Sequence, residues 1–352
     1  MADSGTTEAG GGRAIDVAGW PADGLEAVHA CPLCAASRGP IIHHQLQDLV
    51  NQAPGSWEMR GCGTCGCAYL DPRPTVSSIG LAYATYATHA ATEHPDRVIG
   101  MAGMARRALK NGYLAHRHGY DLSPCWPVGS PLLAVVPGAA RRASRFVRHL
   151  DHPPPGASLL DVGCGNGSFL LSMRQVGWRI QGTEPDSVAA ARAAAAGVPV
   201  VAGLLEEGMF QSASFDVVTL NHVLEHLHDP VATLRICRAL LKPTGHCWVA
   251  TPNLCSEGHR RYGRAWRGLE PPRHLVVFAP ASLDLAFASA GFGTRSRLPA
   301  GLEARHLFLS SEQIAGRPAG RRRQAVAASM TAELRAWRDP DRAEELVVAA
   351  WP

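Results

Sequence analysis

Long hydrophobic runs and lysine are both scarce in this chain of 352 residues. The most apolar run, residues 131–136, is stopped by Pro137 and by Arg141 and Arg142, far short of the roughly 20 apolar residues that a membrane span requires. The first residues are small, acidic and glycine-rich, without the basic start and apolar stretch of a signal peptide. We therefore expect a cytoplasmic protein with no membrane span.

Because lysine occurs only at Lys110 and Lys242, arginine carries nearly all of the positive charge. A formal net charge of +4 without a concentrated basic stripe does not favour a nucleic-acid partner. We expect residues 141–149, with Arg142, Arg145 and Arg148, to form the solvated face of a helix ahead of the first long strand. The ten cysteines are expected to be reduced thiols, because no export signal is present.

Two CxxC pairs near the amino terminus have the spacing of metal ligands. Cys31 and Cys34 form the first pair, and Cys62 and Cys65 form the second. Paired knuckles of this kind predict a tetrahedral Cys₄ zinc site, which is closed and therefore structural. The alternative is a set of unmetallated thiols in a small core. The competing ligands are Cys67, His43 and His44.

A regular alternation of strands and helices follows the proline run 153–155, which is the clearest break in the chain. Strands are expected at residues 158–162, 179–183, 199–201, 215–220, 246–250, 294–298 and 345–349. Helices are expected at residues 101–120, 169–176, 187–196 (capped by Ser187) and 230–240, with a helical insertion at 325–337. This alternation predicts a doubly wound α/β fold, with a mainly parallel sheet between two layers of helices.

We divide the chain into four parts on this basis. Residues 1–25 are expected to be a disordered lead-in, 26–75 a small zinc-ribbon-like module, 76–155 a helical connector or lid, and 156–352 the main α/β domain.

Asp161, Gly163, Gly165 and Gly167 spell DxGxGxG directly after the first strand of the alternation. Glycines at this point allow a sharp turn and a close approach of the backbone to a ligand. A dinucleotide-binding loop is the rival interpretation, but its spacing is GxGxxG, and the Asp161 carboxylate would repel a pyrophosphate. A cationic ligand with an α-amino group would instead attract this carboxylate. The other alternative is a glycine turn that binds nothing.

Three further residues are candidates for the same ligand site. Glu184 ends the second strand, about 20 residues after the loop, where an acid can accept both hydroxyls of a ribose. Leu205, beside Leu204 and Glu206, follows the third strand, where an adenine would lie. Asn221 follows the fourth strand at the same edge of the sheet.

Residues 159–292 resemble the class I S-adenosylmethionine-dependent methyltransferase family, of the type 11/23 kind. The DxGxGxG loop matches the family's first motif, and Glu184 matches its ribose-binding acid. Glu225 and His226 match the frequent EH dipeptide after the fourth strand. The resemblance implies a Rossmann-like sheet of seven strands with the last one antiparallel, and S-adenosylmethionine as the cofactor.

Methyl transfer mainly requires positioning, with a base where the acceptor is a hydroxyl. His274 is the first candidate base and His226 the second; the alternative for His274 is a structural histidine bonded to a backbone carbonyl. Some relatives bind a divalent ion through an acidic residue followed by EH, but His222 holds the first of those positions. We therefore expect no catalytic metal.

The zinc head makes the chain similar to bacterial methyltransferases that act on sugars, surface glycans or natural products. A small-molecule or glycan acceptor, methylated on oxygen or carbon, is therefore expected. The alternatives are an RNA-directed methyltransferase and a non-catalytic zinc-ribbon binding protein on a methyltransferase scaffold.

Overall fold

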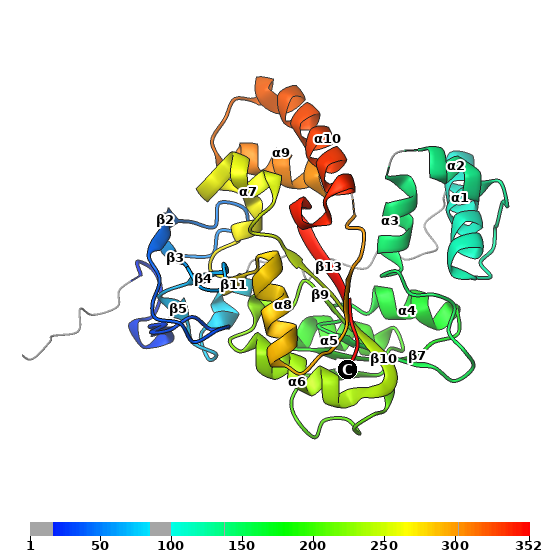
Figure 1. Ribbon diagram of the computed structural model, residues 1–352, viewed down its shortest axis with the longest axis horizontal. Helices are drawn as coiled ribbons and strands as arrows, with labels where there is room; N and C mark the ends of the chain where they lie inside the picture. Colours follow the sequence, from blue (N-terminus) through cyan, green and yellow to red (C-terminus); the bar gives the residue numbers. More distant parts are fainter. Residues whose placement is uncertain (1–16, 85–99, 137, 302) are drawn as a thin grey trace, which may run out of the picture.

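A seven-stranded sheet forms the centre of the molecule (Figure 1). The computed structural model describes residues 17–84, 100–136, 138–301 and 303–352. The strands of this sheet are β6 (Ser158–Val162), β7 (Arg179–Glu184), β8 (Val200–Ala202), β9 (Phe215–Asn221), β10 (Leu241–Pro252), β12 (Arg295–Arg297) and β13 (Glu345–Ala350). Their order is β12-β13-β10-β9-β6-β7-β8; β13 is antiparallel to both of its neighbours, and the other pairs are parallel. The predicted doubly wound sheet with an antiparallel last strand is confirmed.

Helices cover both faces of this sheet because successive strand residues point to opposite sides. Leu159 and Val217 share one core with helices α3 (Ala139–Phe146), α4 (Ser168–Gln175) and α5 (Ser187–Ala195). Their neighbours Leu160 and Val218 share the other core with α6 (Pro230–Leu240) and α8 (Pro280–Ser289). The result is a three-layer arrangement in which the carboxyl ends of the parallel strands meet at one edge.

The amino ends of two helices are fixed by aspartates. Asp229 accepts a hydrogen bond from the backbone of Ala232, 2.8 Å away, and Pro230 begins α6 as predicted. Asp186, and not the predicted Ser187, caps α5, because its carboxylate accepts from Val188 N at 2.8 Å and Ala189 N at 3.1 Å. The prediction placed the cap one residue too late.

A second sheet contains the cysteine-rich segment. It consists of β2 (Ile41–Leu46), β3 (Trp57–Gly61), β4 (Ala68–Leu70) and β11 (Val276–Val277), with a separate pair β1 (Leu25–Glu26) and β5 (Arg73–Pro74). Strand β11 comes from the loop after β10, and its Val276 pairs with Tyr69 of β4. The amino-terminal sheet therefore contains residues from both sides of the predicted boundaries at 75 and 156.

The predicted lead-in extends too far along the chain. Trp20 is buried, donates from Nε1 to Ser78 Oγ at 3.2 Å, and packs edge-on against Trp57 with ring centroids 5.1 Å apart. Residues 17–25 therefore belong to the amino-terminal core. Residues 1–16 lie outside the described part of the chain.

The other helices lie beyond the sheet, with α1 to α3 on the right of Figure 1 and α9 and α10 at its top. They are α1 (Met101–His118), α2 (Gly129–Val135), α7 (Glu257–Tyr262), α9 (Ala304–Ile314) and α10 (Arg322–Arg338). The predicted helical insertion is thus confirmed, as a pair of helices. Among the described residues, no helix is long and apolar enough to cross a membrane.

Candidate donor and acceptor site

The turn between β6 and α4 is built by the three predicted glycines. Gly163, Gly165 and Gly167 have φ angles of +68°, +57° and +78°, which side chains of other residues rarely permit. A Cβ atom at Gly163 would come within 2.7 Å of Val223, and one at Gly167 within 2.7 Å of Val198. A Cβ at Gly165 would meet no atom of the described chain within 4 Å. The middle of the turn therefore faces open space, where a ligand can approach the backbone.

Asp161 lies beneath this turn, and the described residues donate hydrogen bonds to only one of its two carboxylate oxygens. Oδ1 accepts hydrogen bonds from Arg148 Nη1 and from Thr219 Oγ1, the latter at 2.9 Å. Oδ2 is buried and accepts no hydrogen bond from the described residues. Since buried polar atoms are nearly always paired, Oδ2 suits a ligand that brings a donor to this place.

The guanidinium of Arg148 completes this part of the site. It lies 3.5 Å from the ring centroid of Phe169, and its Nη1 donates to Thr219 Oγ1 at 2.6 Å. Arg148 is 7% exposed, whereas Arg142 is exposed. The prediction of a solvated arginine face was therefore wrong for Arg148, which is paired with Asp161, and for Arg145, which is paired with Glu345 and has a side chain only 15% exposed.

Glu184 ends β7 beside the glycine turn, at the predicted edge of the sheet. Its Oε2 accepts from Gly165 N at 2.7 Å, and its Oε1 accepts from Asp186 N at 2.9 Å. Burial raises the pKa of Glu184, although the two backbone N–H groups partly oppose this effect. Each oxygen keeps a lone pair, so the carboxylate can accept two further hydrogen bonds.

The other two candidates for ligand contact differ in their surroundings. Leu205 packs into the core, while Leu204 is 47% exposed. Asn221 lies at the carboxyl end of β9, where its Oδ1 accepts from Arg145 Nη2 at 2.7 Å. Of the two leucines, Leu204 therefore offers more surface to a ligand.

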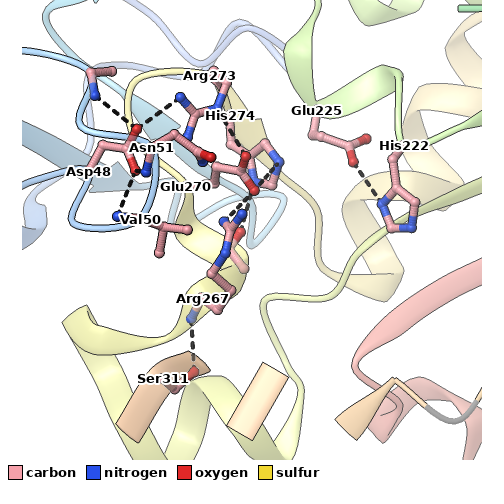
Figure 2. A network of polar contacts seen from close by, with 12 residues as sticks. Asp48, Val50, Asn51, His222, Glu225, Arg267, Glu270, Arg273, His274 and Ser311 are labelled. Carbon is pink, nitrogen blue, oxygen red and sulfur yellow. Dashed lines mark hydrogen bonds and ion pairs between the residues drawn. The ribbon is translucent and has the colours of Figure 1, made fainter. Parts of the chain in front are cut away.

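His222 is held between two carboxylates just after β9. Its Nδ1 lies 3.1 Å from Glu225 Oε1, a contact drawn in Figure 2, and its Nε2 lies 3.3 Å from Glu345 Oε2. Desolvation would lower the pKa of His222, but these two carboxylates outweigh it and raise the pKa to about 10. His222 is thus a cation at neutral pH, and it holds the position where some relatives place an acidic metal ligand.

His274 and His226 lie side by side, with ring centroids 4.8 Å apart. His274 is 4% exposed, and its Nδ1 lies 2.8 Å from the carbonyl oxygen of Gly268, as in the structural alternative. Burial lowers the pKa of His274 to about 4, although Glu270 opposes this effect. His226 is half-buried, with Nδ1 3.0 Å from the carbonyl oxygen of Arg273. Because a carbonyl oxygen can only accept, Nδ1 is the donor in both contacts; His226 Nδ1 also lies 3.2 Å from the Tyr83 hydroxyl.

Glu225 lies next to this histidine pair. Ligand atoms of Glu225, His226 and His274 lie within 4.8 Å of one another, a grouping that could hold a metal ion. Glu225 Oε2 also accepts from Thr251 Oγ1 at 2.9 Å.

Arg273 fixes the loop that carries His274, a role that the sequence did not indicate (Figure 2). Its Nε donates to Glu270 Oε1 and its Nη1 to Asp48 Oδ2, both at 2.9 Å. Asp48 belongs to the amino-terminal part of the chain, so this buried pair ties that part to the site.

The four predicted zinc ligands lie together. Sγ atoms of Cys31 and Cys65 are 3.6 Å apart, and those of Cys34 and Cys62 are 3.5 Å apart. In a tetrahedral site with Zn–S bonds of about 2.3 Å, neighbouring sulfurs would be about 3.8 Å apart, which these distances approach. The sulfur of Cys67 lies 3.5 Å from both Cys31 and Cys65, so the alternative ligand also stays within reach.

Residues 138–296 match a family model described as a methyltransferase domain. The chain carries a methyltransferase domain. The glycine turn, Asp161 and Glu184 all lie within the matched residues.

Curated relatives of this methyltransferase domain include two named ubiquinone biosynthesis O-methyltransferase. The protein from Xanthomonas axonopodis pv. citri is 39% identical over 107 residues, and that from Vibrio campbellii is 38% identical over 105 residues. Each match covers 28% of this chain and 45% of the relative. The chain therefore spans less than half the length of the curated relatives that it matches.

Similar solved structures include the [4+2]-cyclase SpnF, at 22% identity and a TM-score of 0.42, covering 61% of this chain and 81% of that one. Another is the complex of the Haloferax volcanii Trm112 methyltransferase activator with a putative methyltransferase. It has 16% identity and a TM-score of 0.42, and covers 70% of this chain and 95% of that one.

Proposed function

We propose that this protein is an S-adenosylmethionine-dependent methyltransferase that acts on a small-molecule or glycan acceptor. The observation that carries the proposal is the buried Oδ2 of Asp161, which has no hydrogen-bond partner among the described residues and lies beside the Arg148 guanidinium and below the open side of Gly165. A carboxylate next to a guanidinium is complementary to the ammonium and carboxylate of an α-amino acid. Dinucleotides contain no α-amino-acid group.

The residues present suit the rest of S-adenosylmethionine as well. Asp161 would accept from the α-ammonium, Arg148 would donate to the carboxylate, and Glu184 would accept from the ribose hydroxyls. Leu204, Leu205 and Asn221 would contact the adenosine part. When bound, S-adenosylmethionine supplies an electrophilic methyl group on a sulfonium.

The acceptor would lie near His226. This side chain is half-buried, and its Nε2 has no hydrogen-bond partner among the described residues, so it can accept a proton from an acceptor hydroxyl. His274, the first candidate from the sequence, is the more deeply buried of the two neighbouring rings and would act as a positioning residue. Hydroxyl acceptors are supported by the O-methyltransferase names of the relatives.

Structural zinc is part of the same proposal. The thiol groups of Cys31, Cys34, Cys62 and Cys65 have the number, chemistry and spacing of a closed zinc site. No position in such a set is left for substrate, so the ion would stabilise the amino-terminal sheet. The buried polar side chains of Asp161, Arg148 and Glu184 weigh against a non-catalytic scaffold, because a scaffold would not need these groups.

Calorimetric titration with S-adenosylhomocysteine and with methylthioadenosine tests the donor site without changing the protein. Methylthioadenosine lacks the amino-acid end, so it should bind at least about 100-fold more weakly, since two charge-assisted interactions are lost. Equal affinity for both ligands would rule out the role of Asp161 and Arg148. Transfer of labelled methyl groups to fractionated cell extract, with nuclease-treated fractions as the comparison, would then separate small-molecule and glycan acceptors from RNA.

A further inference from the structure

Helix α10 exposes large apolar side chains on the face that points away from the rest of the molecule. Met330, Leu334 and Trp337 are 65%, 63% and 70% exposed. With 3.6 residues per turn, the three side chains fall within an arc of about 60°. The opposite side of the helix is buried; it consists of Ala325, Ser329, Ala332 and Ala336.

Arginines flank this apolar stripe at both ends. Arg322 and Arg323 begin the helix, Arg338 ends it, and all three are exposed. The acid of α10, Glu333, turns instead toward α9, where its Oε1 accepts from Ala304 N at 3.0 Å. The outer face of α10 is therefore apolar along its carboxyl half and has exposed arginines near both ends, while Asp339, directly after the helix, pairs with Arg342.

This combination is complementary to an anionic lipid surface. The apolar side chains can enter the boundary between headgroups and acyl chains, while the long arginine side chains reach the phosphates. A nucleic acid would match the charge but not the three apolar side chains between the arginines.

The end of α10 that carries Trp337 lies on the ligand-binding side of the sheet. Asn253, just after β10, donates from Nδ2 to the carbonyls of Asp341 and Ala343 at 2.8 and 2.7 Å. Glu345 then pairs with Pro252 at the carboxyl end of β10. In Figure 1, α10 is the outermost element at the top of this edge.

We propose that the outer face of α10 docks the protein on an anionic lipid surface. Docking needs neither methyl donor nor acceptor, so the inference stands or falls independently of the proposed function. Flotation of the full chain with vesicles of phosphatidylcholine alone, and with vesicles of equal parts phosphatidylcholine and phosphatidylglycerol, tests it. The chain should float with the mixed vesicles, less so as salt rises, and not with the neutral ones.

Two sets of substitutions localise the contact. Leu334→Gln with Trp337→Gln, and separately Arg323→Glu with Arg338→Glu, should each reduce vesicle binding by at least about tenfold. Val76→Gln, an exposed apolar residue elsewhere, and Arg179→Glu, an exposed arginine of β7, serve as matched controls and should change binding by less than about twofold.

Unaltered circular dichroism and melting temperature would confirm that the variants are folded. Equal binding to neutral vesicles, or mixed-vesicle binding that survives both sets of changes, would overturn the proposal. So would self-association of the wild type, seen by light scattering, that the α10 changes abolish while no vesicle binding occurs. That result would assign the face to a second copy of the chain.

Discussion

The side chains of Asp161 and Arg148 form a buried ion pair, in which each charge neutralises the other. From the sequence, Asp161→Ala is expected to weaken donor binding without unfolding the protein. The structure changes this expectation, because the substitution would leave a buried guanidinium unpaired.

We predict that Asp161→Ala lowers the free energy of unfolding by about 3 to 5 kcal/mol, the usual cost of breaking a buried ion pair. Urea denaturation followed by circular dichroism measures this change. The control is Asp284→Ala, which removes a partly exposed partner of Arg297 and should cost about 0 to 1 kcal/mol. Equal losses in the two variants would show that the Asp161 pair is not buried as described.

The histidine pair gives a second prediction at this scale. With a hydroxyl acceptor, His226→Gln should lower kcat by about 100-fold or more and leave donor affinity unchanged, as expected when a general base is lost. His274→Gln should act more weakly, through the orientation of His226. If His274 itself takes the proton, the larger loss will occur in His274→Gln, and the wild-type rate will rise with pH through about 4, the pKa of that histidine.

Strand β11 connects the two sheets, and its position explains what the sequence could not reveal. The strands of the central sheet and helices α4, α5, α6 and α10 follow from local patterns of hydrophobic runs, glycines and polar caps, whereas α7, α8 and α9 were not predicted. A two-residue strand such as β11 has no such pattern; it forms only because β4 lies beside it. Likewise, Asp48 and Arg273 are 225 residues apart, and nothing in the sequence near either one identifies its partner. Asp161 and the three glycines could be proposed as methyl-donor ligands because they lie in one motif, whereas Arg148 lies in a segment without one.

Because the two sheets share a core, the proposed zinc ion would contribute to the stability of the whole fold. The core around Cys31 and Cys62 continues into Phe278, Leu283 and β10. We predict about one zinc per chain by mass spectrometry of the metal, and a joint loss of zinc and melting temperature in Cys34→Ser, because metal binding contributes to folding free energy. Cys255→Ser, which changes an exposed thiol, should alter neither quantity. Full zinc occupancy in Cys34→Ser would show that Cys67 or a histidine is the real ligand.

At the scale of the whole molecule, stability should be greatest close to neutral pH. Burial lowers the pKa values of His43, His149 and His274 from 6.5 to about 4, so the unfolded chain binds more protons between these values and stability falls as pH falls through this window. His222 acts above it: its pKa of about 10 in the folded state means that its contribution is complete below 6.5 and is lost as pH rises toward 10.

The contribution of Glu344 to stability changes with pH in the opposite direction to that of the three buried histidines. Burial raises its pKa from 4.5 to about 7, so its cost to stability grows as pH rises between these values. Since three groups act against one, urea midpoints measured between pH 4 and 9 should pass through a maximum near neutrality. A midpoint that rises steadily toward pH 4 would contradict the burial of the three histidines.

Direct binding of S-adenosylmethionine, measured by calorimetry on the wild type and on Glu184→Gln, tests the central claim that this chain has a methyl-donor site. The wild type should bind with a stoichiometry of one. Glu184→Gln should bind about 10- to 100-fold more weakly, because a hydrogen bond to a charged group contributes about 1.5 to 3 kcal/mol. No binding to the wild type, or the same affinity in both proteins, would contradict the account.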